Sequence, residues 1–148
     1  MLIVISIIMV LASMFLVVGV RARLNARATY CANNMRQIGM ALGQQIDHGV
    51  SHHWADSIQN MNPHKPLLLC PQGPQDGQTN YGVNQNLIGK PLYSSDTAAT
   101  VLLYESKRAG DSLSGDRRDV DLRHSGMANF VFLDGHVKKT SEIPSFRP

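Results

Sequence analysis

Residues 1–20 read MLIVISIIMVLASMFLVVGV, a run of twenty residues without a charged side chain. An α-helix of this length rises about 30 Å, the thickness of the hydrocarbon core of a bilayer. A cleaved signal peptide would carry a basic residue before the apolar run and a small-residue cleavage site after it, and this sequence shows neither. We therefore predict a retained transmembrane segment over residues 1–20.

The helical pattern continues beyond the apolar run. Apolar or small residues recur at steps of three or four, which places them on one face of a helix: Leu24, Ala28, Cys31, Met35, Ile38, Leu42 and Ile46. Polar side chains define the opposite face: Arg27, Asn33, Asn34, Arg36, Gln37, Gln44 and Gln45. No proline precedes Pro63, and Gly49 after His48 is a typical helix stop. The pattern predicts one nearly continuous helix over about residues 2–48, whose amphipathic second half packs on a partner layer.

Two glycines, Gly39 and Gly43, lie four residues apart in this second half. Either they let the partner layer approach the helix closely, or they only loosen the helix, at a cost of about 1 kcal/mol each relative to alanine.

Length and charge restrict the class of protein. Residues 21–148 carry all the charged side chains and suffice for one modest core. We therefore predict a transmembrane segment over residues 1–20 and a single head domain over residues 21–148. The formal net charge of +3 is mild and no block of like charges occurs, so binding to nucleic acid is not expected.

Short elements follow the long helix. Residues 50–80 are predicted to be largely irregular, with a helical turn over residues 54–61 and with Leu67, Leu68 and Leu69 packed inward. Strands are predicted over residues 81–87 and 101–105, and a polar loop over residues 108–118.

The clearest β-signal is ANFVFLDGHVKKT, residues 128–140. Asp-Gly between two β-rich runs predicts a two-residue type I′ turn, which pairs Leu133 with His136 and Phe132 with Val137. Alternation then places Phe130, Phe132 and Val137 on the face that covers the long helix. The opposite face, predicted to be exposed or at a subunit contact, carries Val131, Leu133, His136 and Lys138.

The two cysteines, Cys31 and Cys70, form either one disulfide or a pair of buried thiols. We favour the disulfide if the head lies in an oxidising periplasm. Arg21, Arg23 and Arg27 argue the other way, because the positive-inside rule would keep that end of the apolar run in the cytoplasm.

Three groups of residues invite a search for a chemical site. His124, Asp134 and His136 resemble an acid–base or metal set, but a strand between His124 and Asp134 separates them by roughly 20 Å. The histidines at 48, 52, 53 and 64 match no zinc spacing. Asp111, Asp116, Asp119 and Asp121 share one loop but lack the alternating calcium-ligand pattern, so a solvated acidic loop is the default and calcium the lesser alternative. We predict no catalytic residue, no cofactor and no metal site.

Several motifs, in this order, resemble bacterial type IV pilin-like and type II secretion pseudopilin-like proteins. The apolar run is followed by Cys31, Asn33-Asn34, Gln37-Ile38-Gly39 and Ala41-Leu42, and then by Cys70-Pro71, Tyr81–Leu87 and Glu105–Lys107. His124, nine intervening residues and Asp134-Gly135 match the H-X9-DG motif that is associated with prepilin processing.

The resemblance implies an α+β, pilin-like fold: a long N-terminal helix, transmembrane in its first half, packed against a small antiparallel β-sheet. It implies a structural, non-enzymatic subunit of an envelope or secretion filament, in which His124, Asp134 and Gly135 are structural. It also implies single-pass anchoring in the bacterial inner membrane, with the head in the periplasm or at the cell surface. The expected partners are membrane lipid and other pilin-like subunits, which bind through the N-terminal helix.

The sequence departs from this family at its start. Met1 aligns just after the glutamate of the family's mature N-terminus. The family's basic leader, its cleavage site and this glutamate are therefore not seen in the sequence. A prepilin peptidase is therefore a partner only if the true start lies upstream. The alternative is a monomeric, membrane-anchored periplasmic binding domain that does not polymerise.

Overall fold

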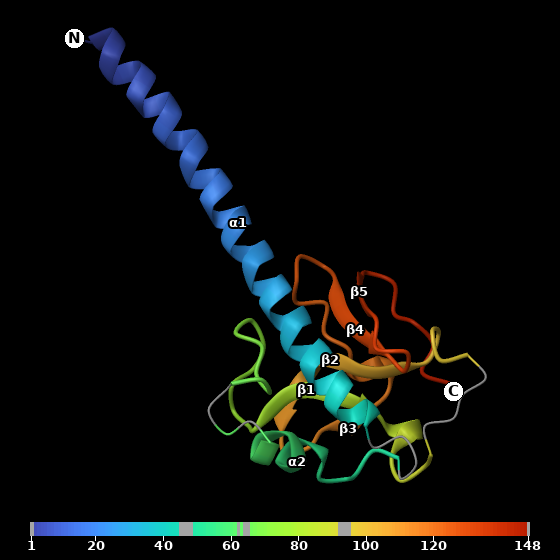
Figure 1. Cartoon of the computed structure of the whole chain (residues 1–148). Helices are drawn as coiled ribbons and strands as arrows, with labels where there is room; N and C mark the ends of the chain where they lie inside the picture. Colours follow the sequence, from blue (N-terminus) through green and yellow to red (C-terminus); the bar gives the residue numbers. More distant parts are fainter. Residues whose placement is uncertain (1, 45–48, 62, 64–65, 92–95, 148) are drawn as a thin grey trace.

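The structure is a computed structural model that describes residues 2–44, 49–61, 63, 66–91 and 96–147. In these residues, one long helix packs on an open five-stranded mixed sheet, which is an α+β arrangement (Figure 1). The chain runs through α1 (Leu2–Gly43), α2 (Trp54–Met61), β1 (Thr79–Asn84), β2 (Val101–Gly110), β3 (Ser114–Gly115), β4 (Ala128–Phe132) and β5 (Val137–Thr140). Two 3₁₀ turns, η1 (Gln85–Leu87) and η2 (Arg117–Asp119), follow β1 and β3.

The helix α1 has two environments along its length. Its N-terminal half extends away from the rest of the molecule, and its C-terminal half lies on the sheet (Figure 1). The predicted continuous helix is confirmed up to Gly43; the predicted helical residues 45–48 lie outside the described part of the chain.

The sheet is mixed, whereas an antiparallel sheet was predicted. Its strand order is β3-β1-β2-β4-β5. Three neighbouring pairs are antiparallel, but β3 pairs with β1 in parallel through Val83–Ser114 and Asn84–Gly115. The predicted loop over residues 108–118 is thus partly wrong, because β2 continues to Gly110 and the chain then returns to add the short strand β3 beside β1.

The predicted apolar face of α1 forms the centre of the core. Ala28, Cys31, Met35, Ile38 and Leu42 are buried, and the last four form one apolar cluster with residues from α2, β1, β2 and β4. The face begins at Ala28, since Leu24 is 38% exposed. Asn34, expected on the polar face, is buried instead, and its amide donates to the carbonyl of Pro66.

The hairpin between β4 and β5 has a different turn from the one predicted. Val131 pairs with Val137 and Phe130 with Lys138, one residue out of the predicted register. Gly135 donates to the carbonyl of Phe132 and has φ +86°. The connection is therefore a three-residue loop in which a type I turn precedes a glycine in the left-handed region.

The two faces of β4 are the reverse of those predicted. Val131, with the partly buried Leu133 and Val137, packs in the core under α1. Phe130 and Phe132 lie in a second cluster with Tyr104 and Phe146, whose rings meet edge to face at 5.1 Å. The sequence pattern showed the alternation of β4 but not that the chain after β5 covers the other side of the sheet.

The smaller elements agree with the sequence. Residues 54–61 form the predicted helical segment, α2, which buries Trp54, Ala55 and Ile58. Leu67 and Leu68 are buried, as expected, whereas Leu69 is only partly buried. The strand predicted at residues 81–87 spans Thr79–Asn84 and ends in the 3₁₀ turn η1, where the side chain of Asn84 accepts from the backbone of Asn86.

Candidate functional site

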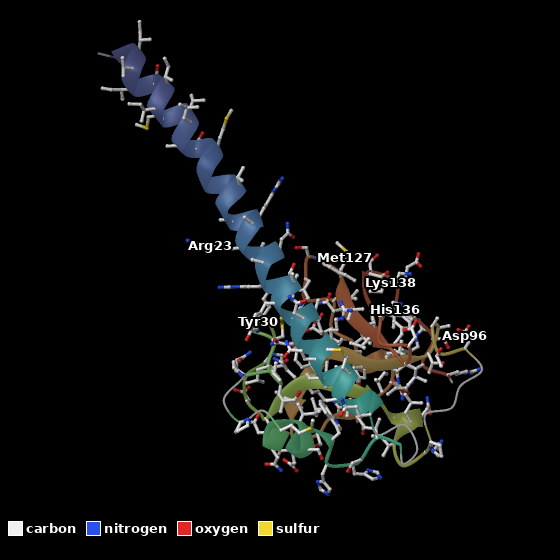
Figure 2. All side chains as sticks on the ribbon, in the orientation of Figure 1. Arg23, Tyr30, Asp96, Met127, His136 and Lys138 are labelled. Atoms are coloured by element: carbon white, nitrogen blue, oxygen red, sulfur yellow. A yellow bond between two sulfur atoms is a disulfide. The ribbon has the colours of Figure 1, made fainter. Side chains whose placement is uncertain are left out.

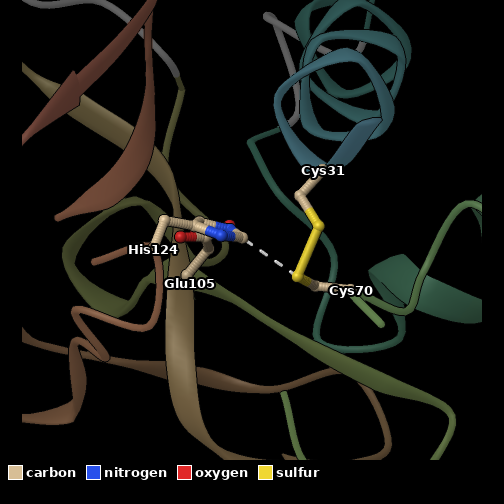
Figure 3. Close-up of side chains that lie close together, drawn as sticks. All are labelled: Cys31, Cys70, Glu105 and His124. Carbon is tan, nitrogen blue, oxygen red and sulfur yellow. Dashed lines mark hydrogen bonds and ion pairs between the residues drawn. A yellow bond between two sulfur atoms is a disulfide. The ribbon is translucent and has the colours of Figure 1, made fainter. Parts of the chain in front are cut away.

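A disulfide joins α1 to the segment that precedes β1. Cys31 and Cys70 are both fully buried, their Cα atoms lie 5.3 Å apart, and 39 positions separate them in the sequence (Figure 3). The predicted bridge is therefore confirmed and the alternative of two free thiols is not. In the chain-entropy model, a cross-link over a loop of this length stabilises the folded state by about 4 kcal/mol.

A buried ion pair lies directly beside the disulfide. His124 precedes β4 and Glu105 lies in β2; His124 Nε2 is 2.6 Å from Glu105 Oε1 and 3.7 Å from the Sγ of Cys70 (Figure 3). The other ring nitrogen of His124, Nδ1, is 2.5 Å from Oε1 of Gln72. Both nitrogens thus face acceptor oxygens, an arrangement that a doubly protonated imidazole satisfies.

Asn129 in β4 holds the carboxylate of Glu105 from the opposite side. Its backbone N–H donates to Oε2 at 3.0 Å, and its side-chain amide donates to Oε1 at 3.0 Å. The same amide reaches the carbonyl of Ala28 in α1 at 3.3 Å. The network therefore links β2, β4, the loop before β4 and α1.

The segment around Cys70 is fixed by a second set of hydrogen bonds. The side-chain oxygen of Asn80 accepts from the backbone N–H of Cys70 at 2.8 Å, and its amide donates to the carbonyls of Cys70 and Pro74. Arg123 donates to the carbonyl of Ser106 and pairs with Asp121 at 3.1 Å. Cys70 is therefore held by Asn80 in β1, and Arg123, next to His124 in the chain, is bound to β2.

Tyr81 lies near this network. Burial raises the pKa of its hydroxyl well above the ordinary value of 10.0, and the negative charge of Glu105 raises it further. The phenol therefore stays neutral in the folded protein.

The Asp-Gly turn is separate from the buried pair. His124 and Asp134 lie beyond opposite ends of β4 and have different partners, as expected from the sequence. Asp134 accepts from the backbone and from Nδ1 of His136, the latter at 2.6 Å, and the His136 ring stacks on Phe132 at 4.2 Å. Partial burial raises the pKa of Asp134, but the hydrogen bonds from His136 outweigh it, so the net pKa is lowered.

The remaining predicted clusters do not converge among the described residues. His52 and His53 are exposed before α2, whereas His48 and His64 lie outside the described residues. In the acidic segment, Asp116 and Asp119 form a capping box around η2, and Asp116 pairs with Arg118. Hydrogen bonding to Arg118 lowers the pKa of Asp116.

Most of the exposed large hydrophobic side chains among the described residues lie on the apolar half of α1. The helix passes the length and hydropathy criteria for a membrane span, and its apolar window has no buried residue. Figure 2 shows these side chains projecting around the helix, with Arg23 on the part between the apolar end and the head. Sequence reasoning predicted this segment.

Sequence reasoning missed the partners of His124. Glu105 is an acidic residue within the apolar strand sequence TVLLYES, and a charged side chain in a buried strand requires a partner. That signal was sufficient to mark Glu105. The sequence contains no comparable signal for Gln72 or Asn129. Only the folded structure brings these two residues into contact with His124 and Glu105.

Comparison with known proteins gave no match: no family model, curated protein or solved structure is significantly similar to this chain.

Proposed function

We propose that this chain is a pilin-like or pseudopilin-like structural subunit, without enzymatic activity, of a bacterial envelope or secretion filament. In this proposal α1 anchors it in the inner membrane and the head lies in the periplasm or at the cell surface. The observation that carries the proposal is the division of α1 into a half that the described part of the chain does not bury and a half that forms the centre of the head.

The exposed half of α1 requires an apolar partner. Ile3 is 76% exposed, Met9 69% and Val18 65%, and they lie on a segment with no charged residue before Arg21. Leaving one such side chain in water rather than burying it costs about 1.5–3 kcal/mol. Lipid or neighbouring helices of the same kind satisfy this requirement.

The same half is suited to packing against copies of itself. Ser6, Ala12, Ser13 and Gly19 interrupt the larger side chains, and small residues let apolar helices approach closely. The hydroxyls of Ser6 and Ser13 donate to carbonyls within the helix, so neither side chain adds an unpaired polar group to such a contact.

The disulfide supports a location of the head outside the cytoplasm. Disulfides persist in oxidising compartments and are rare in the cytosol. Arg21, Arg23 and Arg27, which are exposed between the apolar segment and the head, favour the opposite orientation by the positive-inside rule. We give the disulfide more weight because its two cysteines come from distant segments and meet in the core.

Photo-cross-linking in membranes tests the proposal. A benzophenone amino acid placed at Val10, which is 55% exposed on the apolar half, should give adducts at two or more chain masses. The same label at His52, exposed on the head, is the control for random collision between chains. Carbonate extraction of the same membranes reports whether the chain is anchored.

The outcomes separate the two candidate functions. Chain-to-chain adducts from Val10 support a bundling subunit. Retention in the membrane with lipid adducts alone would replace it by the monomeric, anchored binding domain. A groove of about 510 Å³, lined by Gln85, Asn86, Asp116, Arg117 and residues 143–147, is the feature that favours this second function. Release by carbonate would remove both.

A further inference from the structure

Four potential metal ligands meet at one point in the core. Cys31, Cys70, Glu105 and His124 each offer one ligand atom, and these atoms all lie within 4.8 Å of one another. All four side chains are buried, and they come from α1, the segment before β1, β2 and the loop before β4. We propose that, when the Cys31–Cys70 bond is reduced, these four side chains bind a single Zn²⁺ ion.

The donor set fits this ion. Zn²⁺ prefers thiolate, imidazole and carboxylate ligands in a tetrahedron, with bonds of about 2.0–2.3 Å, so that neighbouring ligand atoms lie about 3.3–3.8 Å apart. The Sγ of Cys70 is already 3.7 Å from Nε2 of His124. Once the covalent bond is broken, the two sulfurs separate, and Glu105 Oε1 moves away from its 2.6 Å contact with Nε2.

Neighbouring residues orient two of these ligands in the way that is usual around metal centres in proteins. A metal-bound histidine usually donates its other ring N–H to an oxygen, which fixes the nitrogen that binds. Here Nδ1 of His124 faces Oε1 of Gln72, which leaves Nε2 directed at the cysteines and at Glu105. Asn129 holds Oε2 of Glu105 through its backbone N–H, so the carboxylate is also positioned.

The disulfide and the metal exclude each other. A disulfide sulfur carries no negative charge, whereas Zn²⁺ binds thiolates. Reduction transfers two electrons and two protons to Cys31 and Cys70 from a dithiol, which is itself oxidised to a disulfide. Metal binding then releases the two thiol protons and the proton on Nε2 of His124. In both states Cys31 and Cys70 connect α1 to the segment that precedes β1, by a covalent bond when oxidised and through the ion when reduced; the ion also connects both to Glu105 in β2.

The test uses the full chain in detergent micelles. The protein is reduced with a dithiol, freed of it without air, and titrated with Zn²⁺ against a chromogenic chelator. One ion per reduced chain and none per oxidised chain is the expected result. Replacing Zn²⁺ by Co²⁺ should give thiolate-to-cobalt charge-transfer bands and the ligand-field bands of a tetrahedral ion. No additional binding after reduction, or a cobalt spectrum without thiolate bands, would overturn the proposal.

Variants separate the buried site from surface histidines. Gln72→Ala removes the acceptor for Nδ1 of His124 and should weaken zinc binding about 10–100-fold. Gln72→Glu keeps an acceptor oxygen there and should restore the affinity. The matched control is His136→Gln, because His136 also lies 2.6 Å from a carboxylate, but on the surface and away from the thiols. If the control lost zinc binding and Gln72→Ala kept it, the ion would belong to the surface and the proposal would be wrong.

Discussion

Replacing Gly39 by alanine tests how closely α1 lies against the sheet. A Cβ added at Gly39 would lie 2.6 Å from Cγ1 of Val131 in β4, too close for any carbon contact. Overpacking of this kind costs typically about 1–3 kcal/mol, whereas alanine gains about 1 kcal/mol over glycine within a helix. We therefore expect Gly39→Ala to lower the free energy of unfolding of the head by about 1 kcal/mol, and by about 2 at most.

Two further variants isolate the contact. Gly43 lies four residues along α1 and an added Cβ there meets nothing within 4 Å, so Gly43→Ala should leave the stability unchanged or raise it by up to about 1 kcal/mol. Val131→Ala removes the methyl group that Gly39→Ala would meet. It should therefore cost less in the Gly39→Ala background than in the unmodified chain, with a coupling energy of about 1–2 kcal/mol.

Unfolding by guanidinium in detergent micelles, followed by tryptophan fluorescence, measures these differences. Trp54 is the single tryptophan; it is fully buried and its indole donates to the carbonyl of Leu113 at 3.0 Å, so its emission reports the head. If Gly39→Ala were as stable as Gly43→Ala, or showed no coupling to Val131, the reasoning that α1 contacts β4 at this glycine would be refuted.

Three other predictions concern the ion pair, the disulfide and the turn. His124→Gln leaves Glu105 buried without its charged partner and should lower the free energy of unfolding by about 3–5 kcal/mol in the same fluorescence assay. His136→Gln, at an exposed pair, is the control and should change the free energy of unfolding by less than about 1 kcal/mol. Equal effects would contradict the assigned burial. Reducing the disulfide in the absence of metal should lower the free energy of unfolding by about 4 kcal/mol, measured on the chain with and without reductant. If the free energy of unfolding did not change, the disulfide would add no stability beyond that of the packed core. The pKa of Asp134 is lower in the folded chain than its ordinary value of 3.8, so its contribution to stability is present above that value and lost as the pH falls through the folded pKa. Between about pH 5 and pH 2, the free energy of unfolding should therefore fall less for Asp134→Asn than for the unmodified chain. Equal falls in the two proteins would contradict the lowered pKa of Asp134.

The sequence predicted α1 well because its signals are local. An uncharged run followed by apolar residues at helical spacing needs no knowledge of the rest of the chain, and Ala28 to Leu42 are buried as that spacing requires. The disulfide was predicted for a similar reason: Cys31 falls on the buried face of the helix, and only one other cysteine exists.

The sheet was predicted less well because strand pairing depends on distant segments. The alternation of β4 was correct, yet its faces were assigned in reverse, since nothing local shows whether α1 covers Val131 or Phe130. The register was wrong by one residue because Asp-Gly also fits a three-residue loop with glycine at positive φ. His124 was expected to be a structural residue, but its burial against Glu105 required the pairing of β2 with β4.

Specific contacts fix the position of α1 along the sheet, which its apolar face alone does not. The apolar face of α1 repeats every three or four residues, so a shift of the helix by one turn, about 5.4 Å, would still place apolar groups on the sheet. Several contacts of the described residues are specific to one position, among them the bond at Cys31, the hydrogen bond from Asn129 to the carbonyl of Ala28, and the approach of Gly39 to Val131. The first two lie where α1 enters the head, so a force on the exposed half of the helix reaches the head first through the disulfide, at the segment before β1, and through Asn129 in β4, which also holds Glu105. A subunit that must keep a fixed distance between its apolar helix and its head would require such a connection at this place.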